Sequence, residues 1–260
     1  MADPRIEFVD VNGCKVRVLR KGSGQPLVFL HGARGGGVWM PFMEALAQHF
    51  DVVAPEHPGF GASDTPPWLD SISDMAFYYL DFLKVMGLSK VHLVGNSLGG
   101  WIALETAVRS CERVASLSVV SPAGLYVKGR PPADIFLWSA EKLTRNLFVS
   151  KEIVEAALKV TPTEEQVREQ IKNNFTVAKL AWNPRFHNPD LRKWLHRIDV
   201  PCLVLWGDQD RLAPVEYAAE FERLLPDAKV RIIKQCGHLP QVEKMAEFVE
   251  AVSEFVKERV

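Results

Sequence analysis

The chain has 260 residues, of which 47% are hydrophobic and 24% charged, and its formal net charge is −1 at neutral pH. This composition predicts a globular protein with a sizeable core, and the balanced charge favours neither nucleic acid nor an anionic membrane surface as a partner. No apolar run approaches the roughly 20 residues that span a bilayer. The N-terminus has no signal-peptide pattern and the four cysteines have no metal-like spacing, so we expect reduced thiols, no metal and a cytoplasmic protein.

Strand and helix patterns alternate along most of the chain. Residues 5–11 and 14–20 alternate apolar and polar side chains around an Asn-Gly turn, which predicts an exposed antiparallel pair. Further strands are expected near residues 26–32, 51–55, 90–95, 114–122, 201–207 and 228–234. Helices are expected over 39–49, from the cap Ser71 to Gly87, over 98–110 and 214–224, and from Pro240 onward. This order predicts an α/β fold with a doubly wound, mostly parallel sheet.

One segment breaks the alternation. Residues 124–198 show only helical patterns between two expected core strands, with Pro and Gly at both ends. Thr161 and Glu164 there form an expected capping box, and Val167, Ile171 and Phe175 recur at helical spacing. We therefore expect a core made of residues 1–123 and 199–260, and a helical cap, or lid, inserted as residues 124–198.

A Gly-x-Ser-x-Gly sequence lies where an expected strand meets an expected helix. In "VHLVGNSLGG" the strand ends just before Ser97, and Gly95 and Gly99 flank it. A serine hydroxyl is a weak nucleophile, so it must be presented to a base and a substrate on a sharp turn. A simple helix cap would instead favour Glu or Gln at position 100, where Gly100 stands. Ser97 is therefore the candidate nucleophile.

The base and the acid are expected at the carboxyl ends of later strands. Asp208 and Asp210 follow the strand at 201–207, and His238 follows the strand at 228–234. Open α/β sheets place their sites at this edge. Ser97, an aspartate and His238 thus follow in the order nucleophile, acid, histidine.

This order, with the motifs around it, resembles the α/β-hydrolase fold. Five motifs match it in sequence, over nearly the whole chain: "FLHGARGG" (30–37), "PEHPGFGASD" (55–64), "VGNSLGG" (94–100), "WGDQDRLAP" (206–214) and "CGHLPQVE" (236–243). The resemblance implies an eight-stranded sheet, an inserted cap and a Ser-His-Asp triad. It places the acid at Asp210 rather than Asp208, because the family's usual G-x-x-D pattern, counted from Gly207, ends at Asp210. The alternative acid position, after the preceding core strand, reads "SPAG" here and offers no carboxylate.

The resemblance also implies an oxyanion hole and suggests residues that contact the substrate. The N–H groups of Leu98 and Ala33 would hold the oxyanion. Arg34 is a candidate partner for an acidic group of the substrate, and His57, Trp138 and Leu239 are further candidate contacts. His31 most often has a structural role in such loops.

The predicted activity is cleavage of a small carboxylic ester through an acyl-enzyme, with no cofactor, by a monomer or homodimer. The nearest alternative is a carbon–carbon bond hydrolase acting on a ring-cleavage product, a vinylogous 1,5-diketone. Those enzymes commonly have a tryptophan after the histidine and a different oxyanion loop, whereas Leu239 and "HGARGGG" stand here. An alternative of another class is a ligand receptor on the same fold. The intact set of Ser97, Asp210 and His238 disfavours a receptor.

Overall fold

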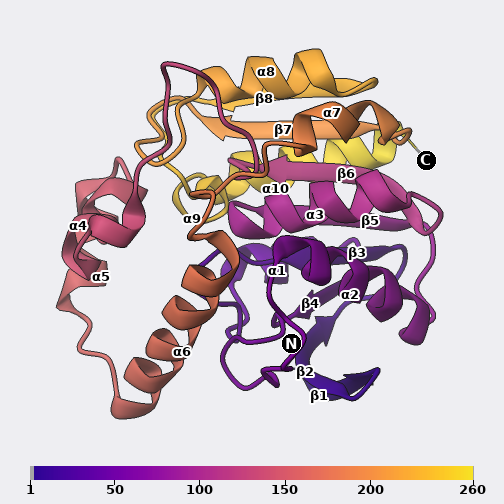
Figure 1. Ribbon diagram of the computed structural model, residues 1–260, viewed down its shortest axis with the longest axis horizontal. Helices are drawn as coiled ribbons and strands as arrows, with labels where there is room; N and C mark the ends of the chain where they lie inside the picture. Colours follow the sequence, from indigo (N-terminus) through magenta and orange to yellow (C-terminus); the bar gives the residue numbers. More distant parts are fainter. Residues whose placement is uncertain (1–2, 260) are drawn as a thin grey trace.

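Eight strands form one twisted sheet in the computed structural model, which describes residues 3–259 (Figure 1). The strands are β1 (Arg5–Val11), β2 (Cys14–Lys21), β3 (Pro26–Leu30), β4 (Asp51–Pro55), β5 (Val91–Asn96), β6 (Val114–Val120), β7 (Cys202–Gly207) and β8 (Ala228–Ile233). Their spatial order is β1-β2-β4-β3-β5-β6-β7-β8. The pairs β1–β2 and β2–β4 are antiparallel, and all others are parallel. The predicted fold class is confirmed.

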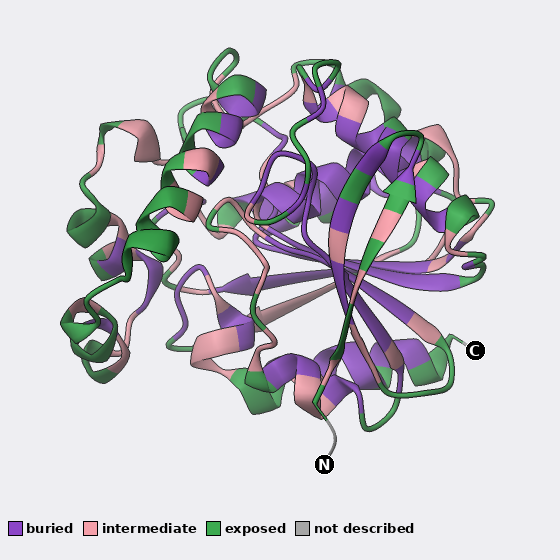
Figure 2. Cartoon of the chain, turned by 90° about the horizontal axis from the view of Figure 1, so that it is seen from below, coloured by how far each residue is buried: buried purple, intermediate pink, exposed green. Residues whose placement is uncertain are grey.

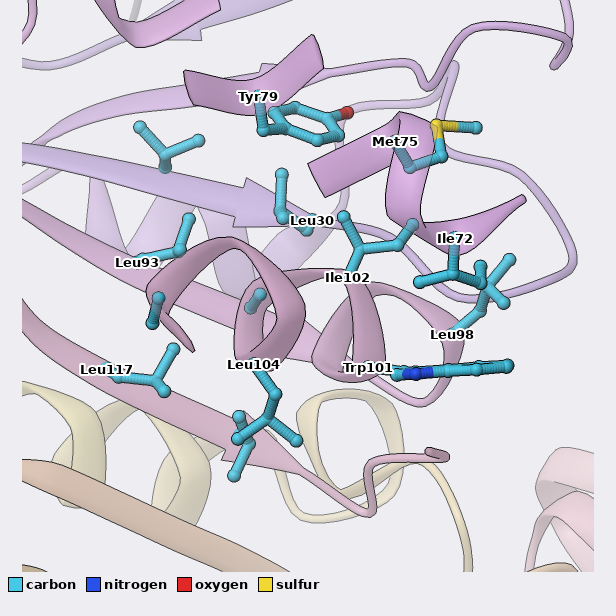
Figure 3. Packing of buried hydrophobic residues seen from close by; sticks show 14 of the residues in the cluster. Leu30, Ile72, Met75, Tyr79, Leu93, Leu98, Trp101, Ile102, Leu104 and Leu117 are labelled. Carbon is cyan, nitrogen blue, oxygen red and sulfur yellow. The ribbon is translucent and has the colours of Figure 1, made fainter. Parts of the chain in front are cut away.

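Helices cover both faces of the sheet because the parallel strands are apolar on both sides. In β3, Leu30 packs with one cluster that includes α2 (Ile72–Val85), α3 (Leu98–Arg109) and α8 (Glu216–Leu224). The preceding residue, Phe29, packs with the opposite cluster, which includes α1 (Pro41–Leu46) and α10 (Met245–Glu258). Figure 3 shows the first cluster, where Ile102 and Leu104 of α3 lie over the sheet. This two-sided packing holds the ends of the central strands in place.

Two local predictions at helix ends can be compared directly with the structure. Ser71 caps α2 as expected: its hydroxyl accepts a hydrogen bond from the Asp74 N–H, and the Asp74 carboxylate accepts one from the Ser71 N–H. The cap predicted at Thr161 is wrong, because Thr163 caps α6 (Glu164–Ala181) together with Gln166. The two overlapping capping boxes satisfy equivalent backbone donors, so local sequence cannot choose between them.

The final helix is also interrupted, contrary to the prediction. It is divided into α9 (Pro240–Glu243) and α10 at Lys244, whose φ of −131° and ψ of 49° are not helical.

None of the helices within residues 3–259 combines the length and the apolarity needed to cross a bilayer.

The segment of residues 124–198, called the insertion from here on, lies between β6 and β7. It contains η1 (Ile135–Leu137), α4 (Ala140–Leu147), α5 (Lys151–Lys159), α6, α7 (Leu191–Trp194) and η2 (Leu195–Arg197). Figure 1 shows α4, α5 and α6 beyond one end of the sheet, and Figure 2 shows that they keep much exposed surface. The apolar stripe of α6 is largely exposed, with Ile171 at 64% and Phe175 at 67%. The face of α6 that is buried against the core carries Asn173 and Thr176 together with Val177, Leu180 and Ala181.

Candidate active site

Ser97 lies between the end of β5 and the start of α3, in a conformation that few serines adopt. Its φ is 53° and its ψ is −113°, and its side chain caps no helix. A Cβ on Gly95 would lie 2.4 Å from the Gly99 carbonyl oxygen, and a Cβ on Gly99 would lie 2.1 Å from the Leu30 carbonyl oxygen. Only glycine fits at both positions, so close packing holds Ser97 in this strained turn. The turn lifts the Ser97 side chain out at the carboxyl edge of the sheet.

His238 and Asp210 meet at the same edge, from the loops that follow β8 and β7. The His238 Nδ1–H donates a 2.8 Å hydrogen bond to Asp210 Oδ2, and both side chains are at most 5% exposed. The other carboxylate oxygen of Asp210 accepts from the N–H groups of Leu212 at 2.8 Å and Ala213 at 3.0 Å. The carboxylate is therefore fixed on both oxygens, and it fixes the histidine tautomer that leaves Nε2 as an acceptor. Asp208 accepts instead from the Cys236 N–H.

Ser97 and His238 line one pocket with an almost entirely apolar wall. Its apolar residues are Pro122, Ala123, Leu125, Pro132, Ala133, Ile135, Phe186, Leu212 and Ala213. Three of the lining residues carry hydroxyls: Ser97, Ser121 and Tyr217. Residues 125–135 and Phe186 belong to the insertion, so the insertion supplies part of the wall. Among the described residues that line this pocket, none is an acid, a lysine or an arginine.

The peptide between Gly32 and Ala33 is held in a fixed orientation. Its carbonyl oxygen, on Gly32, accepts from the His31 Nδ1–H at 2.8 Å and from the Gly35 N–H at 3.2 Å. Because a peptide is planar, fixing this carbonyl also fixes the Ala33 N–H on the opposite side. The N–H of Leu98 begins α3, where helix donors lack partners within the helix. The Ala33 N–H is thus fixed in direction and the Leu98 N–H has no partner within α3, so both stay candidates for the predicted oxyanion hole.

A buried pair of histidines supports this loop. His31 Nε2 accepts from the His57 N–H at 3.0 Å, and the His57 Nε2–H donates to the His31 carbonyl at 2.9 Å. The remaining nitrogen of His57 accepts from the Tyr79 hydroxyl. Burial lowers the pKa of His31 to about 4 and the pKa of His57 well below its usual value. Both rings are therefore neutral near pH 7, as their accepting nitrogens require.

The residues predicted to contact substrate lie outside the pocket wall. His57 is fully buried with both ring nitrogens engaged, so it has none left for a ligand. Trp138 and Leu239 pack with Leu147 and Phe148 in a small cluster beside the His238 loop. Arg34 is exposed, next to the oriented peptide of Ala33.

Among the residues that line the pocket, the sequence identifies only Ser97 and His238; Ser121, Tyr217 and Phe186 are among those it does not identify. Ser121 follows β6 with a φ of 43°, and its buried hydroxyl has no hydrogen-bond partner within residues 3–259. Tyr217 in α8 donates to the Arg130 carbonyl at 2.8 Å and accepts from the Val127 N–H at 3.1 Å, which ties the start of the insertion to the core. Phe186 comes from the later part of the insertion, between α6 and α7. Ser121, Tyr217 and Phe186 come from segments that are distant in sequence. Of the three, only Ser121 has an unusual feature, its positive φ, and no sequence pattern reveals that angle.

Comparison with known proteins gives the same fold. A family model described as the alpha/beta hydrolase family matches residues 27–251. The chain is 30% identical to the 2-hydroxy-6-oxo-6-(2'-aminophenyl)hexa-2,4-dienoic acid hydrolase of Metapseudomonas resinovorans, over 97% of this chain and 91% of that protein. It is 27% identical to the 2-hydroxy-6-oxo-2,4-heptadienoate hydrolase of Pseudomonas putida, over 96% and 95% of the two chains.

Solved structures extend the likeness to the whole chain. The 2-hydroxy-6-oxo-6-phenylhexa-2,4-dienoate hydrolase of a Rhodococcus species superposes with a TM-score of 0.78 and 26% identity, covering 99% of this chain and 100% of that one. A naproxen esterase of Bacillus subtilis has a TM-score of 0.77 over 97% and 91% of the chains, but at 21% identity it shows the fold alone. With its eight-stranded sheet and a family match over most of its length, this chain belongs to the α/β-hydrolase family and is a hydrolase.

Proposed function

We propose that this protein is a serine hydrolase that cleaves a small, uncharged carboxylic ester. The observation that carries the proposal is the pocket at Ser97 and His238, whose wall is apolar apart from hydroxyls and the histidine. Such a wall suits the acyl or alkoxy group of a neutral ester. A substrate with its own carboxylate would need a cation there to offset the loss of hydration.

In the proposed acylation step, Ser97 Oγ attacks the ester carbonyl carbon while His238 Nε2 takes its proton. Asp210 keeps the ring oriented through Nδ1–H and stabilises its cationic form. The oxygen that becomes negative accepts from the N–H groups of Ala33 and Leu98. Each donor of this kind typically contributes about 10²–10³ in rate.

The tetrahedral intermediate then collapses to an acyl-enzyme. The bond to the alkoxy oxygen breaks, and the protonated His238 gives that oxygen its proton, so an alcohol leaves. Water follows, activated by the now neutral His238, and attacks the Ser97 ester. A second collapse releases the carboxylic acid and restores the Ser97 hydroxyl.

A second candidate is hydrolysis of a carbon–carbon bond in a ring-cleavage product. Two observations favour it: the relatives above are named as hydrolases of 2-hydroxy-6-oxo-dienoates, and the exposed Arg34 lies beside the proposed oxyanion loop. Arg34 would then pair with the carboxylate of the dienoate from the rim of the site. Leu239, where the ring-cleavage enzymes commonly have tryptophan, weighs against this candidate.

A substrate panel separates the two candidates. We would measure kcat/KM for p-nitrophenyl acetate, butyrate and octanoate, and for 2-hydroxy-6-oxo-6-phenylhexa-2,4-dienoate, with the wild type and Arg34→Gln. The ester proposal expects the wild type to prefer an ester and Arg34→Gln to keep that activity. Preference for the dienoate, with KM for it rising in Arg34→Gln, would establish the second candidate instead.

A further inference from the structure

The loop that carries His238 is bound to the insertion as well as to the sheet. The His238 N–H donates to the Leu147 carbonyl at 2.8 Å, at the end of α4. A Cβ on Gly237 would lie 2.4 Å from the same oxygen, so Gly237 allows this close approach. The backbone of the histidine loop is thus in direct contact with the turn between α4 and α5.

Glu243 joins the two sides of this contact. One carboxylate oxygen accepts from the Gly237 N–H at 2.6 Å, directly before His238. The other oxygen accepts from the backbone N–H groups of Val149 at 2.7 Å and Ser150 at 2.5 Å, where α5 begins. Hydrogen bonds to a charged acceptor are about twice as strong as neutral ones. A single carboxylate therefore holds three backbone donors from two segments that are about 90 residues apart.

The apolar contacts around Glu243 cross the same boundary. Leu147, Phe148 and Val154 of the insertion form a buried cluster with Leu212, two residues after Asp210. Leu239, next to His238, packs against this cluster. Both the acid loop and the histidine loop are therefore supported from the insertion side.

We propose that Glu243 is a positioning residue for His238, and that it makes the reactivity of Ser97 depend on how the turn of residues 147–150 is docked. Glu243 does not line the pocket, so it acts through the backbone of the histidine loop. A displacement of about 1 Å in a catalytic group can cost 10²-fold in rate. The inference rests on the proposed role of His238 as the base for Ser97.

The test is the rate at which a fluorophosphonate probe labels Ser97, which depends on His238 but not on the natural substrate. Glu243→Gln keeps the side-chain shape but replaces one acceptor oxygen with an NH₂ donor that faces an N–H. We expect labelling to slow about tenfold to hundredfold, and kcat for an ester to fall with little change in KM. The low-field proton resonance of the His238–Asp210 hydrogen bond should shift or broaden. Glu247→Gln, which alters an exposed glutamate in the first turn of α10, is the matched control and should change none of these.

A second pair of variants tests the same contact without altering Glu243. Ser150→Pro removes the backbone N–H that donates to Glu243, and the φ of −64° at this residue suits proline. Ser150→Ala removes only the hydroxyl that caps α5. Slower labelling in Ser150→Pro than in Ser150→Ala supports the inference even if Glu243→Gln does not fold. Combining Glu243→Gln with Ser150→Pro should add little further loss.

The outcomes separate this inference from the proposed function. If folded Glu243→Gln and Ser150→Pro label Ser97 as fast as their controls, with an unchanged resonance, Glu243 only stabilises the fold and the inference is wrong. If the wild type itself fails to label at Ser97, the proposed function is wrong.

Discussion

The neutral pair of His31 and His57, which supports the proposed oxyanion loop, predicts a specific loss of stability in mild acid. Burial lowers the pKa of His31 from 6.5 to about 4, so between these values the unfolded chain binds a proton that the folded chain does not. The free energy of unfolding must therefore fall as pH falls through this range. For His31 alone the loss between pH 7 and pH 5 is about 2 kcal/mol. His57 and the buried His92, whose pKa values are also lowered, add to the loss.

The protonated form of His31 would also break the contact it makes in the fold. Its Nε2 accepts from the His57 N–H, and a proton there would remove that acceptor. Urea unfolding followed by circular dichroism at pH 7, 6 and 5 measures the loss, and proton NMR follows the ring resonances of the folded protein. We expect His57→Gln to have a shallower pH dependence than the wild type. A His31 resonance that titrates near 6.5, or equal stability at pH 7 and pH 5, would refute the reasoning.

Three further predictions follow from single contacts. Asp210→Asn should lower kcat about 10⁴-fold because it alters the His238 tautomer, whereas Asp208→Asn should keep most activity. Steady-state kcat of the two variants tests this, and the reverse result would move the acid to Asp208. Gly99→Ala would place its Cβ 2.1 Å from a carbonyl oxygen and should cost about 3 kcal/mol or more of unfolding free energy; an unchanged urea midpoint would contradict this. Asn173 accepts from the Gly61 N–H at 2.9 Å and donates to the Arg34 carbonyl at 3.2 Å. Asn173→Ala should therefore lower the free energy of unfolding by about 1–3 kcal/mol and lower kcat. Wild-type stability and kcat in this variant would show that the link between α6 and the proposed oxyanion loop is dispensable.

The parts of the molecule that follow from local pattern are predicted well from the sequence. The continuous apolar run of β3 identifies a central strand, the alternation of strands and helices identifies the parallel sheet, and the alternating pair at the N-terminus identifies the antiparallel edge. Ser97, His238 and the neighbouring Asp208 and Asp210 each follow a predicted strand, and the carboxyl ends of parallel strands share one edge. The choice of Asp210 over Asp208 comes from the resemblance to the α/β-hydrolase fold. The hydrogen bond between Asp210 and His238 is consistent with that placement.

Features that depend on contacts between distant segments could not be predicted in this way. Periodicity marks Ile171 and Phe175 as one face of a helix, but it does not say that this face stays exposed while Asn173 is buried. The pocket wall draws on Tyr217 and Phe186, which no motif connects to Ser97. Glu243 ends a recognised motif, yet its three backbone partners appear only when the insertion is docked.

In the proposed mechanism, Ser97 forms the acyl-enzyme with His238 as its base. Rapid mixing with p-nitrophenyl butyrate, followed by acid quench and peptide mass mapping, tests it most directly. We expect a burst of p-nitrophenol and a butyryl group on the peptide that contains Ser97, with neither in Ser97→Ala. Turnover that persists in Ser97→Ala, or a butyryl group on another residue, would contradict it.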